Sequence, residues 1–503
     1  MDKSLEFHRR HTEERSAARS EMLEGLFVAG EWVGGTTSGG TFEVTNPSNG
    51  ETVAVLPDGG REEMRRAIDA AAAAQPEWAE RTAADRAAIM QNAARLMHER
   101  KERLARVMTL EQGKPLAESR GEIDYAASFI EWFAEEGKRV YGETIPASFP
   151  DKRILVIKRP VGVTAAITPW NFPAAMITRK LGPALAAGCS MVIKPARLTP
   201  LSALEMAKIF EEAGLPKGLL SVIVGTDTSS VTSAIMEDER VRKLSFTGST
   251  EVGKLLMKQA ADTMKRLSLE LGGHAPFMVF DDADVDAAVD GALVSKMRNM
   301  GQTCVCANRI FVQRGIAEEF TRKLAEKMSA MRVGDGLEEG VTVGPLVEPK
   351  AVEKVEQHVQ DALEKGARLV VGGARIRGNN GTENFYAPTV VTDADETMLV
   401  AKEETFGPVA AIMPFDGEDE AIRRANDTVY GLAAYYYTRD VGRVFRLMEK
   451  LEYGTIGAND GMPSTAQAPF GGLKESGFGR EGGRQGIEEY LDTKYVSLGG
   501  VAS

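Results

Sequence analysis

The sequence predicts an α/β fold in two successive halves, each a parallel sheet covered by crossover helices. First, the chain has 503 residues, more than the ~250 to 300 that one hydrophobic core usually holds. Second, short apolar runs rich in β-branched residues alternate with helical stretches, as in strand, loop and helix units. Third, a second half with the same pattern begins after about Leu271. We therefore expect two or three lobes.

The first half opens with predicted helices and continues with predicted strands. Residues 62–74 and 85–109 carry Ala, Glu, Arg, Met and Leu at helical spacing, and Pro76 is expected to interrupt the first run. Four apolar runs then end at Gly or Pro: VGVTAAITPWNFP, SMVIKPARLTP, LLSVIVG and VRKLSFTGS. Because helical stretches lie between them, these runs predict parallel strands.

The second half carries the strand-like runs APFMVF, RIFVQ, ARLVVGG, FYAPTVV and PVAAIMPF. Residues 141–160 and the tail after about Gln485 fit neither half. We expect these two segments to form a separate arm that pairs strands with another subunit.

Composition excludes several classes of function. The net charge of -12 and a pI near 5.3 disfavour binding to nucleic acid or to an anionic membrane. The first twenty residues are polar, without an apolar stretch long enough for an export signal or a membrane span, so a cytoplasmic protein is expected. Three cysteines are too few for a secreted disulfide framework. No histidine has the spacing of a zinc site, so no metal is expected.

A nucleotide site is predicted where two strands end. In SFTGSTEVG, Gly248 and Gly253 follow an apolar strand and open a helical run, whose free N–H groups suit a phosphate; a tight turn without a ligand explains the same spacing. Lys194 stands at the carboxyl end of another strand, as a partner for ribose hydroxyls. Arg197 suits a 2′-phosphate, which favours NADP over NAD, although a solvated surface arginine is the alternative.

Cys304 is the candidate nucleophile. A glycine-containing approach, Met300-Gly301-Gln302-Thr303, lets the backbone expose the thiol, whereas Cys189 lies in an apolar run. Glu270, in the strand-like LSLELGG, is a candidate base because burial raises the pKa of a carboxyl group. A buried salt bridge is the alternative interpretation of Glu270.

Six motifs, in order across almost the whole chain, resemble the aldehyde dehydrogenase superfamily: PWNFP, FTGSTEVG, LELGG, GQTCVCANR, EETFGPV and PFGGLKESGFGREGG. Longer strings, among them TPWNFPAAMITRKLGPALAAGC and CVCANR, are similar to succinate semialdehyde dehydrogenases. The resemblance implies a homotetramer made of two dimers. It also implies a Rossmann-like cofactor-binding domain at 20–140 and 161–271, an α/β catalytic domain at 272–462, and a small β oligomerisation arm at 141–160 and 485–503.

The resemblance also implies a role for each site residue. Cys304 attacks the aldehyde, the Asn171 amide and the Cys304 N–H stabilise the oxyanion, and Glu270 activates the water that hydrolyses the thioester. The implied cofactor residues are Trp170, Asn171, Lys194, Pro195, Ala196, Arg197, Gly248, Ser249, Leu271, Glu404 and Phe406.

A distal carboxylate on the substrate is predicted from charge and resemblance together. Arg179 lies eight residues beyond Asn171, about two turns along the same predicted helix, so it can face the same pocket. In succinate semialdehyde dehydrogenases, residues matching Arg179, Arg298 and Ser464 hold the substrate carboxylate. The wording around Ser464, including Pro463, departs from the usual family pattern, so glutarate semialdehyde or another aldehyde competes with succinate semialdehyde.

Cys306 is open to two interpretations. It is a small apolar neighbour facing away from Cys304, or it forms a reversible disulfide with Cys304 that switches the enzyme off, as in relatives with the same Cys-x-Cys.

Two other classes of function are weighed against an aldehyde dehydrogenase. A nonenzymatic nucleotide-binding or structural protein needs none of Cys304, Glu270 and Asn171, which are all present. Relatives that pass the acyl group to coenzyme A commonly lack the base that Glu270 supplies.

Overall fold

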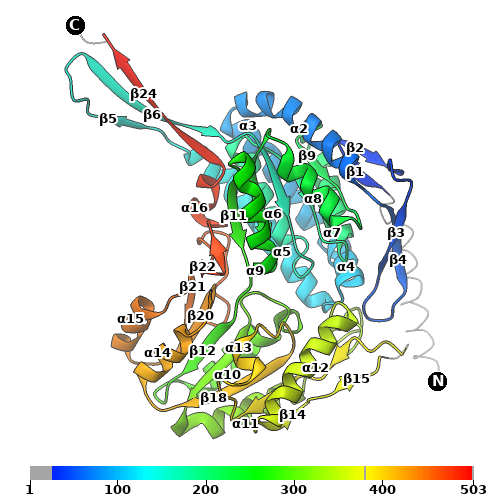
Figure 1. Ribbon diagram of the computed structural model, residues 1–503, viewed down its shortest axis with the longest axis vertical. Helices are drawn as coiled ribbons and strands as arrows, with labels where there is room; N and C mark the ends of the chain where they lie inside the picture. The colour runs from blue at the N-terminus through cyan, green and yellow to red at the C-terminus, as the bar shows by residue number, and fades with distance from the viewer. Residues whose placement is uncertain (1–24, 379–380, 501–503) are drawn as a thin grey trace.

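Two lobes and a projecting arm make up the computed structural model, which describes residues 25–378 and 381–500 (Figure 1). Each lobe has its own sheet and its own cluster of buried apolar side chains. The first cluster draws on residues 26–271 and on the C-terminal stretch 466–491, and the second draws on residues 275–470. The predicted α/β fold is confirmed.

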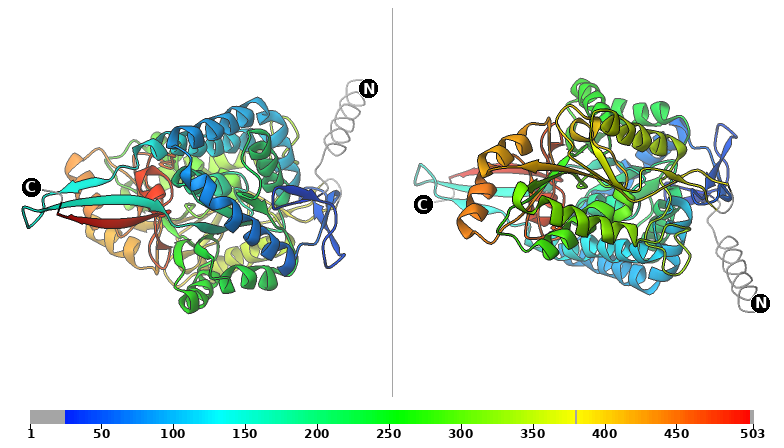
Figure 2. Two further views of the ribbon diagram at one scale, coloured as in Figure 1. Left: turned by 90° about the horizontal axis from the view of Figure 1, so that it is seen from above. Right: turned by 90° about the horizontal axis from the view of Figure 1, so that it is seen from below.

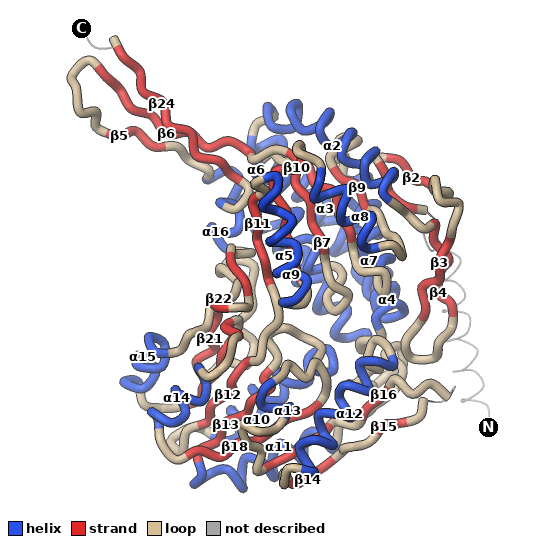
Figure 3. Tube along the Cα trace, in the orientation of Figure 1, coloured by secondary structure: helices blue, strands red, loops and turns tan. Residues whose placement is uncertain are grey.

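An eight-stranded sheet forms the centre of the first lobe, in the order β2-β1-β9-β8-β7-β10-β11-β23 (Figure 3). The five strands from β9 to β11 run parallel, whereas β1, β2 and β23 at the edges pair antiparallel with their neighbours. Every residue of β7 and β8 is buried, since helices cover both faces of the sheet (Figure 2). The strands are β1 (Leu26–Val28), β2 (Glu31–Val33), β7 (Val163–Ile167), β8 (Ser190–Lys194), β9 (Leu220–Val222), β10 (Val241–Thr247), β11 (Arg266–Glu270) and β23 (Gly477–Phe478).

The helices of the first lobe form two groups. Helices α2, α8 and α9 pack together, and α3 to α7 pack together, with α16 against α5 and α6. Their bounds are α2 (Arg61–Glu80), α3 (Ala83–Glu99), α4 (Lys101–Gln112), α5 (Leu116–Glu136), α6 (Ala175–Ala187), α7 (Pro200–Glu212), α8 (Thr228–Glu237), α9 (Thr250–Ala260) and α16 (Gly483–Glu488).

The first helices differ from the sequence prediction in two ways. Pro76 does not interrupt α2, which continues to Glu80. A proline removes one helical hydrogen bond, but the buried Trp78 donates from Nε1 to the Leu185 carbonyl at 3.0 Å and anchors the last turn. The single helix predicted over 85–109 is two helices, because Arg100 leaves helical backbone angles between α3 and α4.

A seven-stranded sheet, in the order β14-β17-β18-β13-β12-β20-β21, forms the second lobe (Figure 3). All neighbours are parallel except β14 and β17. Its strands are β12 (Ala275–Val279), β13 (Ala307–Gln313), β14 (Arg368–Val371), β17 (Thr389–Thr392), β18 (Val409–Phe415), β20 (Ala433–Tyr437) and β21 (Thr455–Ala458). Its helices are α10 (Val285–Met297), α11 (Ala317–Ser329), α12 (Pro349–Glu364), α13 (Leu399–Lys402), α14 (Glu418–Asn426) and α15 (Val441–Lys450).

The arm is a three-stranded antiparallel sheet that projects beyond the first lobe (Figure 1). Its order is β24-β6-β5, and β24 pairs with β6 over nine residues, from Leu491 opposite Pro160 to Gly499 opposite Lys152. The two segments that fit neither half of the sequence therefore pair with each other. The strands are β5 (Glu143–Ile145), β6 (Lys152–Pro160) and β24 (Leu491–Gly499).

Short hairpins and single turns complete the chain. The pairs are β3 (Thr41–Thr45) with β4 (Thr52–Pro57), β15 (Arg375–Ile376) with β16 (Phe385–Tyr386), and β19 (Tyr430–Gly431) with β22 (Leu473–Lys474). The 3₁₀ turns are η1 (Gly137–Arg139), η2 (Ala261–Thr263), η3 (Arg298–Gly301) and η4 (Arg314–Ile316). Among the described residues, none of the helices combines the length and the apolar character that crossing a bilayer requires.

Trp78→Phe is expected to lower the free energy of unfolding by ~0.5 to 1.5 kcal/mol, because it removes one buried hydrogen bond while the Leu185 carbonyl keeps the Gly188 N–H at 3.1 Å. Urea-induced unfolding followed by far-UV circular dichroism measures the change.

Trp132→Phe is the matched control. Its Nε1 is buried without a hydrogen-bond partner in the described chain, so the same change removes an unsatisfied donor. A larger loss of stability in Trp132→Phe than in Trp78→Phe would contradict the anchoring role of Trp78.

Candidate active site

Cys304 lies in a loop between η3 and β13 and is partly exposed. The loop begins with three consecutive residues at positive φ: Asn299 (50°), Met300 (55°) and Gly301 (76°). A Cβ on Gly301 would lie 2.1 Å from the Gly407 carbonyl oxygen, so only glycine allows this approach. The thiol is therefore presented by a tightly constrained backbone.

A cavity of about 760 Å³ opens in front of Cys304. It lies at the carboxyl ends of β7, β10 and β11, where open α/β sheets bind ligands. Of the predicted catalytic and cofactor residues, those that line it are Trp170, Asn171, Gly248, Ser249, Glu270, Leu271, Cys304, Glu404 and Phe406.

The predicted stretch from Lys194 to Arg197, including Pro195 and Ala196, is not part of that lining. Lys194 ends β8, and burial lowers its pKa to about 8. Arg197 is exposed. The nucleotide role of this stretch stays a prediction.

A second cavity of about 500 Å³ lies beside the first: Asn171 lines the first cavity, and the next residue, Phe172, lines the second. Arg298 and Ser464 both line the second cavity. The Arg298 guanidinium lies over the rings of Phe172, at 4.6 Å, and Tyr125, at 5.8 Å. It forms no ion pair with a carboxylate of the described chain. Arg298 therefore offers an available positive charge within an aromatic wall.

Arg179 is buried close to both cavities, since its charge acts on Tyr125 in the second and on Glu270 and Cys304 in the first. It lines neither cavity, and its Nε lies 2.6 Å from Glu481 Oε2, with the guanidinium 4.2 Å from the Phe470 ring. Asn171 and Arg179 do not share a helix, because α6 begins only at Ala175. The carboxylate-binding role of Arg179 stays a prediction, and its guanidinium already forms an ion pair with Glu481.

Glu270 is buried, and Cys304 beside it is partly exposed at the floor of the first cavity. Burial raises the pKa of Glu270, and the positive charges of Arg179 and Lys180 oppose that rise. Burial and the charge of Glu270 raise the pKa of Cys304 well above its usual range. The resting site therefore favours a thiol beside a carboxyl group that can accept its proton.

Asn171 is fixed from several sides. The side-chain Nδ2 of Asn171 donates to the backbone carbonyl of Gln302 at 3.1 Å, and the backbone carbonyl of Asn171 accepts from Lys114 Nζ at 2.7 Å. Lys114 forms a buried ion pair with Glu122 at 2.5 Å. Glu122 also accepts the N–H groups of Ala174 and Ala175 at the start of α6. An amide nitrogen carries two N–H groups, so one remains for a ligand.

Glu404 lines the first cavity, and His274 is buried in the chain segment that leads into β12. Glu404 accepts the Gly273 N–H at 3.2 Å, and burial raises its pKa to about 8. His274 donates from Nε2 to the Ala401 carbonyl at 2.9 Å, and burial lowers its pKa well below the usual value. His274 is therefore a neutral hydrogen-bonding residue.

Cys306 is not the apolar neighbour that one interpretation predicts. Its buried thiol accepts a hydrogen bond from Lys296 Nζ at 3.3 Å, and Lys296 also donates to Asn308 at 3.0 Å. Cys304 and Cys306 are both free thiols, and a disulfide between them stays a prediction.

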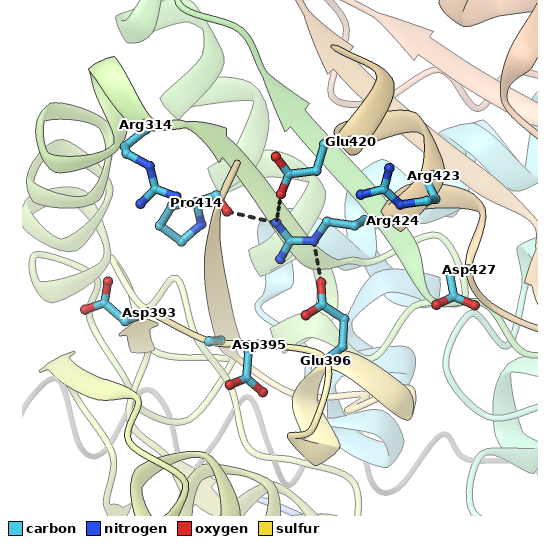
Figure 4. Close-up of a pocket in the computed structure, with 10 residues that line it drawn as sticks. Arg314, Asp393, Asp395, Glu396, Pro414, Glu420, Arg423, Arg424 and Asp427 are labelled. Atoms are coloured by element: carbon cyan, nitrogen blue, oxygen red, sulfur yellow. Dashed lines mark hydrogen bonds and ion pairs between the residues drawn. The ribbon is translucent and has the colours of Figure 1, made fainter. Parts of the chain in front are cut away.

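A third cavity, of about 610 Å³, lies at the opposite end of the second sheet (Figure 4). Within it, Arg424 binds Glu396, Glu420 and the Pro414 carbonyl. It contains none of the predicted site residues.

Several residues of the site escaped sequence reasoning. Glu481 lies about 300 positions from the lysine and arginine that it pairs with, Lys180 and Arg179. Glu118 and Asn299 do not belong to any short motif that indicates a function. No local pattern signals such contacts, because they form only when distant segments fold together.

Glu270→Gln is expected to shift the alkylation of Cys304 towards lower pH. Because the charge of Glu270 raises the pKa of Cys304, its removal makes the reactive thiolate available at lower pH. Rates of alkylation of Cys304 by iodoacetamide, followed by mass spectrometry from about pH 6 to 10, give the midpoint without needing catalytic activity. The Cys304→Ala protein reports background labelling of the buried Cys189 and Cys306. A midpoint that stays or rises would show that Glu270 exerts no such charge effect.

Comparison with known proteins identifies the family. The profile of the aldehyde dehydrogenase family matches residues 32–496. The chain is 57% identical over 473 residues to a succinate-semialdehyde dehydrogenase named for NADP(+) from Escherichia coli K12, covering 94% of this chain and 97% of that protein. It is 56% identical over 472 residues to a glutarate-semialdehyde dehydrogenase from Pseudomonas putida, covering 94% and 97%. A crystal structure of an E. coli NADP-dependent enzyme superposes with a TM-score of 0.93 at 56% identity, covering 95% of this chain and 98% of that one. The chain belongs to the aldehyde dehydrogenase family.

Proposed function

We propose that this protein oxidises succinate semialdehyde to succinate and uses NADP in preference to NAD. The observation that carries the proposal is the unpaired Arg298, set in an aromatic wall beside Ser464, in the cavity next to that of Cys304. An aldehyde that spans the two cavities places its carbonyl at the thiol and its carboxylate at the guanidinium.

The chemistry begins with proton transfer from Cys304 to Glu270, a carboxyl group whose pKa burial raises and which can therefore hold the proton. The thiolate then attacks the aldehyde carbon. The free N–H of the Asn171 amide and the backbone N–H of Cys304 stabilise the oxyanion that forms. After loss of hydride the carbon is a thioester of Cys304, and Glu270 activates the water that hydrolyses it.

The residues around the first cavity fit a nicotinamide dinucleotide. Gly248 and Ser249 lead into the 11-residue helix α9, whose first N–H groups suit a phosphate. The Lys194 ammonium, buried at the carboxyl end of β8, suits ribose hydroxyls, and Glu404 and Phe406 line the inner end. When bound there, the nicotinamide supplies the hydride acceptor. Arg197 suits the 2′-phosphate.

The choice of substrate rests on the second cavity and on the relatives. Succinate and glutarate semialdehydes both carry a distal carboxylate and differ by one methylene, worth only ~1 to 3 kcal/mol of discrimination. A succinate-semialdehyde dehydrogenase and a glutarate-semialdehyde dehydrogenase both resemble this chain. Glutarate semialdehyde is therefore the alternative substrate.

We also infer a homotetramer in which the arm joins subunits. Support comes from exposed apolar side chains on the arm, including Ile145 at 40% and Tyr495 at 62% exposure. Open strand edges and apolar surface favour pairing with a second copy.

Arg298→Met is expected to lower kcat/KM for succinate semialdehyde about 10- to 100-fold, because a charge-assisted contact to the carboxylate is lost. Butanal, which has the same chain length without a carboxylate, is the control and is expected to change little. NADPH absorbance on a panel of succinate semialdehyde, glutarate semialdehyde and butanal gives the rates. A wild-type preference for butanal, or equal losses for all three, would remove the proposed substrate class; a preference for glutarate semialdehyde would select the alternative.

Arg197→Ala is expected to lower kcat/KM for NADP about tenfold or more and to leave NAD nearly unchanged, because only NADP carries the 2′-phosphate. Initial rates with each cofactor at saturating aldehyde test this. If both cofactors lose equally, or the wild type prefers NAD, Arg197 does not read the phosphate.

A further inference from the structure

We propose that Asn299 is a positioning residue that holds the oxyanion donor Asn171 against the nucleophile loop. The proposal rests on the proposed cysteine chemistry and deepens it, because Asn299 lines neither the first nor the second cavity and acts through Asn171. Asn299 is completely buried and lies five residues before Cys304.

The Asn299 side chain joins two loops from different lobes. Its Nδ2 donates to the Asn171 carbonyl at 3.0 Å and to the Gln302 carbonyl at 3.1 Å. The Asn171 side chain donates to that same Gln302 carbonyl at 3.1 Å. These bonds form a closed triangle of Asn299, Asn171 and Gln302, with Cys304 two residues further on. A shift of Asn299 therefore moves the oxyanion donor and the nucleophile relative to each other.

The orientation of the Asn299 amide is determined by its neighbours. Gln112 Nε2 donates to Asn299 Oδ1 at 2.9 Å, and Gln112 Oε1 accepts the Lys114 N–H at 2.9 Å. A backbone N–H only donates and the two carbonyls only accept, so one assignment of both amides satisfies every bond. Gln112 thus points the Nδ2 of Asn299 at Asn171.

The backbone N–H of Asn299 is bound by a residue of the second cavity. Its N–H donates to Glu118 Oε2 at 2.7 Å, and Glu118 lines the same cavity as Arg298. Asn299 also adopts a left-handed φ of 50°, which asparagine tolerates better than most residues. Glycine at position 299 can therefore adopt the same backbone angles but cannot form the hydrogen bonds of the Asn299 side chain.

Asn299→Gly separates these two properties, since it keeps the left-handed backbone and removes only the amide. We expect the rate of Cys304 acylation by 4-nitrophenyl acetate to fall about 10- to 100-fold, because acylation passes through an oxyanion at Asn171. Alkylation by iodoacetamide forms no oxyanion, so its limiting rate at alkaline pH should stay within about threefold of the wild type. Release of 4-nitrophenolate needs no cofactor or aldehyde, so this readout is independent of the substrate proposed above.

Asn459→Gly is the matched control. Asn459 also has a left-handed φ, of 54°, and its side chain bonds both backbone groups of Thr438 outside the three cavities. It is expected to keep both the acylation and the alkylation rates. Gln112→Met tests the orientation of the amide: it should lower acylation alone, and the double variant with Asn299→Gly should lose no more than Asn299→Gly does.

The results separate the two proposals. Acylation in Asn299→Gly within about threefold of the wild type would overturn the positioning role, as would acylation and alkylation falling together with thermal stability. Wild-type protein that is acylated yet oxidises no semialdehyde would defeat the proposed function and leave the positioning role standing.

Discussion

One contact between the lobes governs the geometry of the site: the Gln302 carbonyl of the second lobe accepts the Asn171 amide of the first. It fixes the distance between the oxyanion donor and the nucleophile loop. The left-handed turn at residues 299–301 and the close approach of Gly301 to Gly407 leave that loop little freedom. The site is thus preorganised by backbone constraint, and its donors need no rearrangement when charge develops.

Charge is the second organising feature of the cleft. Glu270, Arg179, Lys180 and Glu481 are all buried within the first lobe, where each ion is costly without its partners. Glu481 pairs with both Arg179 and Lys180, and their remaining positive charge opposes the rise that burial causes in the pKa of Glu270. A carboxylate kept this way has a raised pKa and is available for proton transfer. Arg298 is different, since aromatic rings line its guanidinium and the carboxyl group of Glu118 acts on it without a direct ion pair in the described chain, so a ligand can still bind it.

The sequence predicted strands and their ends more reliably than contacts between distant segments. β7 and β8 were predictable because each has an apolar centre rich in small or branched residues and ends near a proline, and the family motifs singled out Cys304, Glu270 and Asn171. The prediction that Pro76 interrupts the helix was wrong, because the contacts of Trp78 outweigh the loss of one helical hydrogen bond at the proline. The expectation that Asn171 and Arg179 share one helix was wrong, because helical spacing was counted from Asn171, whereas α6 begins four residues later. The rule that ligands meet the carboxyl ends of strands holds for the first sheet, but the second presents the opposite ends, before β12, β13 and β18.

The edge strand β23 has a consequence for the order in which the protein is completed. It pairs with β11, and Ile487, Tyr490 and Leu491 join the first core, although some 200 residues of the second lobe separate them from the rest of it. During synthesis the amino-terminal lobe therefore exposes one apolar flank until the last segment emerges. The second lobe, continuous in the chain, can close first. Completion of the amino-terminal lobe is thereby tied to the carboxyl terminus, and a chain that stops short of β23 leaves an open sheet edge for other strands to bind.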